Sequence, residues 1–95
     1  TEMKKVCAHG ETYQVPIAPH NTKGPVGIMA AAHVMAAIPN PLIQEFITPT
    51  RIPWRNDVLS HPLEIQDSHL IVPDRPGLGV EFIEEALAHH RVAQS

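Results

Sequence analysis

Two ionisable side chains, His20 and Glu45, attract attention because each comes at the end of a short apolar run. His20 follows residues 15–18 (VPIA) and Pro19, and Glu45 lies within residues 42–46 (LIQEF). Histidine titrates near neutral pH, so it can donate or accept a proton during a reaction. A glutamate in an apolar setting can stay protonated and donate a hydrogen bond to a developing oxyanion. Together they suit proton abstraction next to a carboxylate, or elimination of a hydroxyl.

The segments between these two side chains predict how they could meet. Residues 15–18 and 42–46 show little alternation, which is typical of parallel strands buried on both faces. Between them, Pro25 suits the first turn of a helix, and residues 26–38 (VGIMAAAHVMAAI) are apolar nearly all round, as in a buried helix. Neighbouring strands of such a βαβ unit lie about 4.8 Å apart. Because ligands bind at the carboxyl ends of parallel strands, we expect His20 and Glu45 at one site.

Spacing alone leaves a purely structural alternative open. His20 could cap the helix that follows it, and Glu45 could form a salt bridge with Arg51 or Arg55. Trp54 and Arg51 lie in a loop expected to border the pocket, so each is a candidate substrate contact. Alternatively, Trp54 packs the loop and Arg51 faces solvent.

The spacing of apolar residues and the positions of turn residues predict the secondary structure of the remaining segments. Residues 1–14 read as the end of a helix with Gly10 as its stop, because Met3, Val6 and Cys7 form one apolar stripe. Residues 48–60 read as irregular. Residues 63–74 read as a hairpin turning at residues 67–68, and residues 80–95 as a final amphipathic helix. His33 is expected to be a packing or capping residue within the buried helix.

Fold class and domain organisation follow from these elements. Two strands, an almost wholly apolar helix and a hairpin cannot enclose one another in 95 residues. We therefore predict an α/β chain that forms part of a larger barrel or sheet and is incomplete as a domain. We expect residues 1–60 to hold the two strands and their helix, and residues 61–95 the hairpin, the PGLG loop and the final helix; the family resemblance described below implies that the two strands are the last of a barrel.

Composition excludes several classes of function. The formal net charge is -3, with acids and bases mixed along the chain, so a nucleic-acid surface and a polybasic membrane patch are not expected. No apolar run reaches the roughly 20 residues of a membrane span. The single cysteine excludes an internal disulfide and a cysteine-based zinc site. With no visible signal peptide, the pattern predicts a cytoplasmic protein.

Two longer motifs carry a family resemblance. Residues 15–45 (VPIAPHNTKGPVGIMAAAHVMAAIPNPLIQE) and residues 73–82 (PDRPGLGVEF) resemble the C-terminal part of the mandelate racemase group of the enolase superfamily. The similarity is closest to acid-sugar dehydratases of the galactonate dehydratase type. It implies the last two strands of a (β/α) barrel, their connecting helix, and a hairpin and helix that return to the capping domain.

The resemblance also implies residue roles. His20 matches the histidine that acts as general acid and protonates the departing 3-hydroxyl. Glu45 matches the glutamate that hydrogen-bonds the substrate carboxylate and stabilises the enediolate. The resemblance further implies a small sugar-acid substrate, a Mg²⁺ cofactor and a homo-oligomeric full-length enzyme.

One departure from the family limits what this chain can do. The three carboxylate magnesium ligands, the base and the aspartate that pairs with the strand-seven histidine all belong to earlier strands. We therefore expect no metal ligands within these residues and no complete reaction from them alone. A racemase or epimerase of the same superfamily, and a non-catalytic structural piece, remain as alternatives.

Overall fold

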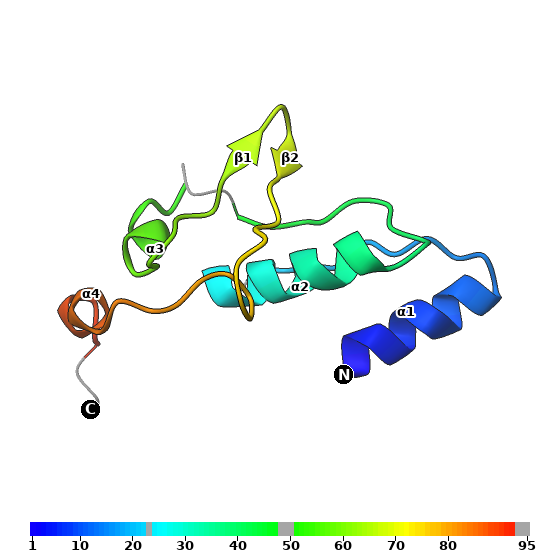
Figure 1. Cartoon of the computed structure of the whole chain (residues 1–95), viewed down its shortest axis with the longest axis horizontal. Coiled ribbons are helices and arrows are strands. Elements are labelled where there is room, and N and C mark those ends of the chain that lie inside the picture. Colours follow the sequence, from blue (N-terminus) through cyan, green and yellow to red (C-terminus); the bar gives the residue numbers. More distant parts are fainter. Residues whose placement is uncertain (23, 48–50, 93–95) are drawn as a thin grey trace.

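The computed structural model describes residues 1–22, 24–47 and 51–92. The regular structure of the described residues consists of helices and one short hairpin, which lies between the third and fourth helices (Figure 1). The elements in chain order are α1 (Glu2–Thr12), α2 (Pro25–Ala37), α3 (Trp54–Asp57), β1 (Ile65–Gln66), β2 (His69–Leu70) and α4 (Glu84–His89).

In the first helix, α1, only part of the predicted apolar stripe is buried: Cys7 is 1% exposed, whereas Val6 is 62% exposed. The prediction that Gly10 stops the helix is wrong, because α1 continues to Thr12. The Gly10 carbonyl instead accepts hydrogen bonds from the backbone N–H groups of Tyr13 and Val15 and so turns the chain after the helix. A side chain at Gly10 would come within 3.0 Å of Ile17, so glycine allows the following segment to lie close against the helix.

The two predicted strands lie side by side and parallel, but their pairing is short. The Ile17 N–H donates to the Asn40 carbonyl and the Leu42 N–H donates to the Ile17 carbonyl, each at 2.8 Å. The bridge between Ile17 and Pro41 is parallel, as predicted for a βαβ unit. Neither 15–18 nor 42–46 forms an extended strand in the described residues, because prolines at 16, 19 and 41 supply no N–H groups for a longer ladder.

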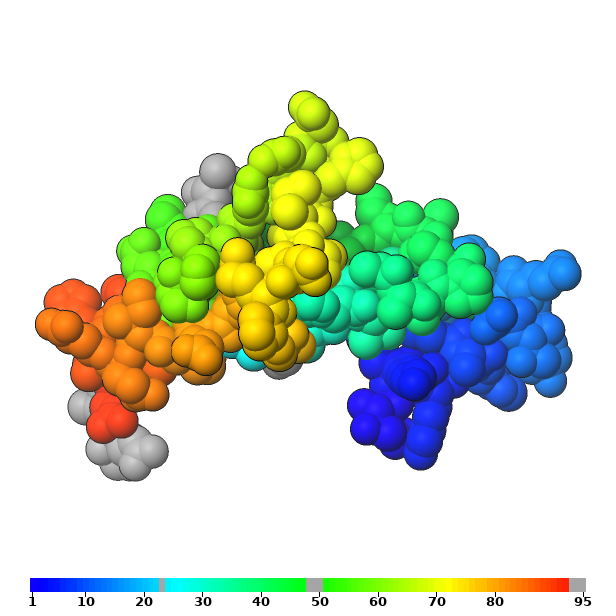
Figure 2. All heavy atoms as spheres, viewed as in Figure 1, coloured from blue at the N-terminus to red at the C-terminus, as the bar shows by residue number. Residues whose placement is uncertain are grey.

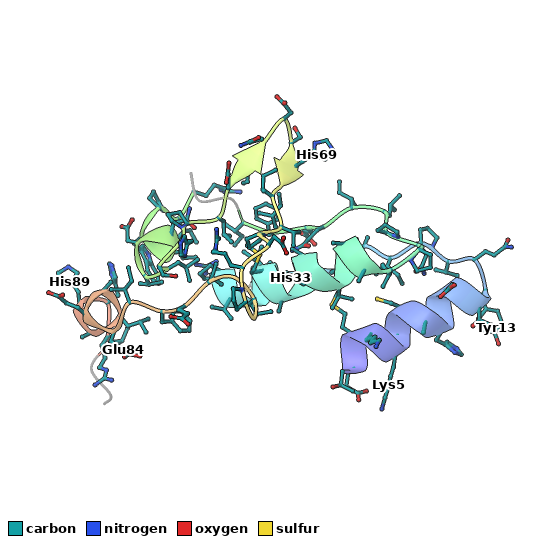
Figure 3. All side chains as sticks on the ribbon, viewed as in Figure 1. Lys5, Tyr13, His33, His69, Glu84 and His89 are labelled. Atoms are coloured by element: carbon teal, nitrogen blue, oxygen red, sulfur yellow. The ribbon has the colours of Figure 1, made fainter. Side chains whose placement is uncertain are left out.

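The connecting helix α2 forms the centre of the molecule. Pro25 occupies its first turn, as predicted, and Ile38 ends it in an extended conformation. Its buried residues Ile28, Met29 and Ala32 join Leu59 and Leu63 in the main hydrophobic cluster. On another face, the His33 ring nitrogen Nε2 lies 2.9 Å from the Leu78 carbonyl, which ties the PGLG loop to α2 (Figure 3). The predicted structural role of His33 is confirmed.

The hairpin turns where the sequence predicts. Ile65 pairs with Leu70 and Gln66 with His69, in antiparallel register. Asp67 and Ser68 both have positive φ angles, 47° and 63°, as a two-residue hairpin turn of type I′ requires. His69 lies near the tip of this hairpin (Figure 3) and lines a hollow together with Met35 and Ala36 of α2.

The C-terminal part departs from the sequence prediction in two ways. Residues 48–60 are not wholly irregular, because α3 forms at Trp54–Asp57. The final helix is shorter than 80–95, since α4 begins only at Glu84. Residues 81–83 are extended instead and pair with residues 58–60: Ser60 donates to the Glu81 carbonyl and Ile83 to the Val58 carbonyl. Residues 93–95 of the predicted helix lie outside the described residues, as do 48–50 of the preceding loop.

The molecule is elongated, with principal extents of 45 × 34 × 27 Å. The α1 and α4 helices lie at opposite ends, and the hairpin projects from the middle (Figure 2). Among the described helices, none combines the length and apolar character needed to cross a membrane.

Candidate functional site

The site is built where the two parallel segments end. After the pairing of Ile17 with Leu42, the next contact along the two segments is the Glu45 N–H donating to the Pro19 carbonyl at 3.2 Å. This hydrogen bond sets Glu45 beside the peptide that leads into His20. Backbone pairing therefore brings two side chains that are 25 residues apart to neighbouring positions at one edge of the fold.

His20 and Glu45 form a direct polar pair. The imidazole Nδ1 lies 2.6 Å from the Glu45 carboxylate Oε2. With a protonated imidazole the pair is a charge-assisted hydrogen bond, which is short and strong compared with a neutral one. The side chains are 72% and 61% exposed, so the pair faces outward from this chain and is open to a ligand. Imidazole and carboxyl groups are each able to pass a proton to a bound molecule or take one from it.

The loop that carries His20 is packed against the start of α2. Asn21, the next residue, is 9% exposed. Its side chain lies over Gly27, where an added Cβ would stand 3.6 Å from the Asn21 amide nitrogen. The helix N-cap is Gly24. His20 pairs with Glu45 and is not the helix cap, so the structural alternative offered for it is wrong.

The two predicted substrate contacts lie in the next segment of the chain. Trp54 opens α3, is 46% exposed, and stacks on His90 with ring centroids 4.8 Å apart. Arg51 is exposed in the turn before α3. The structure brings neither into contact with His20 or Glu45, and their role toward a substrate stays a prediction.

Two contacts near the site were not predicted from the sequence. The Arg55 guanidinium Nη1 donates to the Thr22 carbonyl at 3.4 Å, which brings α3 next to the loop that follows His20. The Gln44 side-chain amide donates to the Ile28 carbonyl in α2 at 2.8 Å. The sequence signal that could have identified Gln44 as a structural contact is its polar side chain within the mainly apolar residues 42–46.

A metal centre does not form from these residues. Within the described ranges, no group of three or more histidine, cysteine, aspartate or glutamate side chains is arranged to hold a metal ion. The oxygen ligands that Mg²⁺ prefers are therefore not gathered in this part of the chain. Among the described residues, His20 and Glu45 do not belong to any such group of three.

Comparison with protein families settles the relationship of the chain. Residues 1–86 match the family model described as "Enolase C-terminal domain-like". The chain belongs to this family. The match spans the parallel segments, α2, the hairpin and the first half of α4, so the His20–Glu45 pair lies inside it.

Individual relatives of this enolase C-terminal domain-like chain agree. It is 36% identical, over 96% of its length, to a D-xylonate dehydratase from Haloferax volcanii, and other matching proteins are named D-galactonate dehydratase. The chain spans about a fifth of the length of the curated relatives it matches. The predicted resemblance to acid-sugar dehydratases is confirmed.

Solved structures place the fold in the same group. A mandelate racemase/muconate lactonizing enzyme-like protein from Rubrobacter xylanophilus has a TM-score of 0.83 at 36% identity, with 96% of this chain and 23% of that one covered. A Burkholderia xenovorans protein, provisionally named an L-alanine-DL-glutamate epimerase and bound to magnesium and fumarate, has a TM-score of 0.77 at 34% identity. In that case, 90% of this chain and 21% of the other are covered.

Proposed function

We propose that this chain is the C-terminal portion of a Mg²⁺-dependent acid-sugar dehydratase, formed by its last two barrel strands with the hairpin and helix that follow. The observation that carries the proposal is the 2.6 Å contact between His20 and Glu45 at the ends of two parallel segments. Similarity to proteins named D-xylonate and D-galactonate dehydratase supports the reaction class. The substrate is a small sugar acid.

The chemistry divides between this chain and the rest of the enzyme. A base outside the chain removes the proton next to the sugar carboxylate, and the electron pair moves onto that carboxylate as an enediolate. Glu45 donates a hydrogen bond to the carboxylate oxygens, where negative charge develops. As the enediolate collapses, the C3–O bond breaks and His20 gives its proton to the leaving hydroxyl, releasing water. The enol product then tautomerises to a 2-keto-3-deoxy acid.

Magnesium is proposed for the whole enzyme and not for these residues. A neighbouring structure holds the ion, and an enolate oxygen on a divalent cation is strongly stabilised. The described residues do not gather the oxygen ligands such a site needs. We place the ligands on segments outside this chain.

The first test is the intact mass of the native polypeptide, followed by a dehydration assay of that protein with a panel of sugar acids. We predict that His20→Asn lowers kcat by about 10²–10⁴-fold, the usual contribution of a general acid. The matched control is His69→Asn, the same substitution on the exposed hairpin, which should leave turnover unchanged. Turnover by His20→Asn within a few-fold of wild type would show that His20 is not the acid.

A second candidate function is racemisation or epimerisation, favoured by the likeness to the protein provisionally named an epimerase. There His20 would return a proton to carbon and no water would leave. Product analysis by NMR distinguishes a 2-keto-3-deoxy acid from an epimer. A third candidate is a non-catalytic structural piece, which would be supported by a native mass equal to that of these 95 residues.

Assembly and location are further proposals. We propose that the full-length enzyme is a homo-oligomer in the cytoplasm that binds neither nucleic acid nor membrane. Light scattering of the native protein measures the oligomeric state.

A further inference from the structure

Gln44 links the catalytic edge of the chain to its most buried helix. The Gln44 Nε2 donates to the Ile28 carbonyl at 2.8 Å. Ile28 is 1% exposed and lies in the first turns of α2, at the centre of the main hydrophobic cluster. The side-chain amide is therefore fixed to a rigid part of the molecule.

Gln44 and Glu45 are adjacent in the chain but contact different parts of the molecule. The Gln44 amide reaches the Ile28 carbonyl in α2. The Glu45 carboxylate instead lies 2.6 Å from the His20 imidazole. Fixing the Gln44 side chain therefore fixes the direction in which the Glu45 carboxylate projects.

The same helix also governs His20. The α2 helix begins at Pro25, five residues after His20, and Asn21 is packed over Gly27 in its first turn. The positions of both side chains therefore depend on the first turns of α2. His20 is held there through its loop, and Glu45 through the neighbouring Gln44. Figure 1 shows both extended segments running along this helix.

We propose that Gln44 is a positioning residue: its hydrogen bond to Ile28 holds the Glu45 carboxylate at reaction distance from His20. This inference rests on the proposed function of the pair. Backbone pairing next to Glu45 consists of one hydrogen bond, from Glu45 to the Pro19 carbonyl, whose 3.2 Å length is at the upper end of the usual range. A misplacement of about 1 Å at a catalytic group can cost about 10²-fold in rate, so this tether has a kinetic effect.

The test is a double-mutant cycle on the native full-length protein. Gln44→Met keeps the side-chain length and removes the amide. The Ile28 carbonyl keeps its helical hydrogen bond, so the fold should survive. We expect kcat/KM with the sugar acid to fall about 10-fold through kcat, with KM within about two-fold, because one tether is lost and not a substrate contact. In the background of Glu45→Gln, the same change should have almost no further effect.

A second readout does not depend on activity. In a crystal structure of Gln44→Met, we expect the distance between His20 Nδ1 and Glu45 Oε2 to exceed about 3.5 Å, beyond hydrogen bonding. The matched control is His33→Phe, which removes one side-chain-to-backbone hydrogen bond from the same helix and should leave that distance unchanged.

The outcomes separate the inference from the proposed function. A full additional 10-fold loss in the double variant, or an unchanged distance in Gln44→Met, overturns the positioning role. If no sugar acid is turned over by wild type while the distance still lengthens in Gln44→Met, the positioning role stands and the dehydratase proposal fails.

Discussion

At the residue scale, the His20–Glu45 contact could be predicted because both residues follow apolar runs and the helix between them returns the chain in parallel. What the sequence could not supply was the direction of each side chain. Gln44 and Glu45 are adjacent polar residues, and only the Gln44–Ile28 hydrogen bond tells which one faces the helix. The structural alternative, a salt bridge from Glu45 to an arginine, was equally compatible with the spacing.

A prediction at this scale concerns Glu45 itself. Glu45→Gln keeps the size of the side chain but replaces the carboxyl group that pairs with His20 at 2.6 Å. We expect kcat of the native enzyme to fall about 10²-fold, because an amide is a weaker donor to a developing oxyanion than a carboxylic acid, and the loss is therefore at the lower end of that for a donor removed outright. Steady-state kinetics measure the effect, with Glu11→Gln on exposed α1 as the matched control. A loss confined to KM would show that Glu45 only binds the substrate carboxylate.

Trp54 has a stacking partner that its local sequence does not indicate. Its place after the second apolar strand suggested a substrate contact, yet in this chain its ring stacks on His90 from α4. The sequence signal was ambiguous because a tryptophan in a loop can either bind a ligand or pack a neighbour. The partner lies 36 positions later, beyond any local pattern.

At the element scale, helix α2 and the hairpin were predicted closely because local chemistry defines them. Pro25 fixes a helix start, and Asp67-Ser68 suits a turn with two positive φ angles. The C-terminal helix was predicted too long because its amphipathic pattern extends into residues 81–83. Those residues pair with 58–60 instead, a non-local contact that overrides helix propensity.

The PGLG loop gives a prediction for two glycines that differ in surroundings. Gly77 and Gly79 both have positive φ, 64° and 75°. A Cβ at Gly77 would meet open space, whereas one at Gly79 would collide with the Pro73 ring. We expect Gly77→Ala to cost about 1–2 kcal/mol from the left-handed backbone alone, and Gly79→Ala to cost more because the proline ring cannot yield.

Scanning calorimetry of the native protein measures this difference. Gly79→Ala should lower the midpoint of thermal unfolding further than Gly77→Ala does. Equal shifts for the two variants would mean that the loop relaxes away from Pro73, and that the contact with His33 does not hold it in place.

At the scale of the whole molecule, the chain is more open than an independent domain of its size. Its accessible surface is 7053 Å², while a compact 10.5 kDa protein exposes about 5,400 Å². Its radius of gyration is 14.8 Å, against about 12.4 Å for a compact domain of this length. Leu42 and Ile43, close to Glu45 in the sequence, are each 66% exposed. In the proposed full-length enzyme, further barrel strands along this edge would cover them.

This openness leads to a prediction for residues 1–95 prepared alone. Only eight hydrophobic residues are buried among the described ones, so apolar burial offsets little of the conformational entropy that the chain loses on folding. We therefore expect unfolding to be broad rather than cooperative. We expect this polypeptide to bind the dye ANS and to show no micromolar Mg²⁺ site by calorimetry, because its described residues gather no ligand cluster. In the proposed full-length enzyme, amides of α2 should exchange hydrogen far more slowly. A sharp melting transition without ANS binding would mean that these residues fold as a domain by themselves and need no further strands to cover their exposed apolar edge.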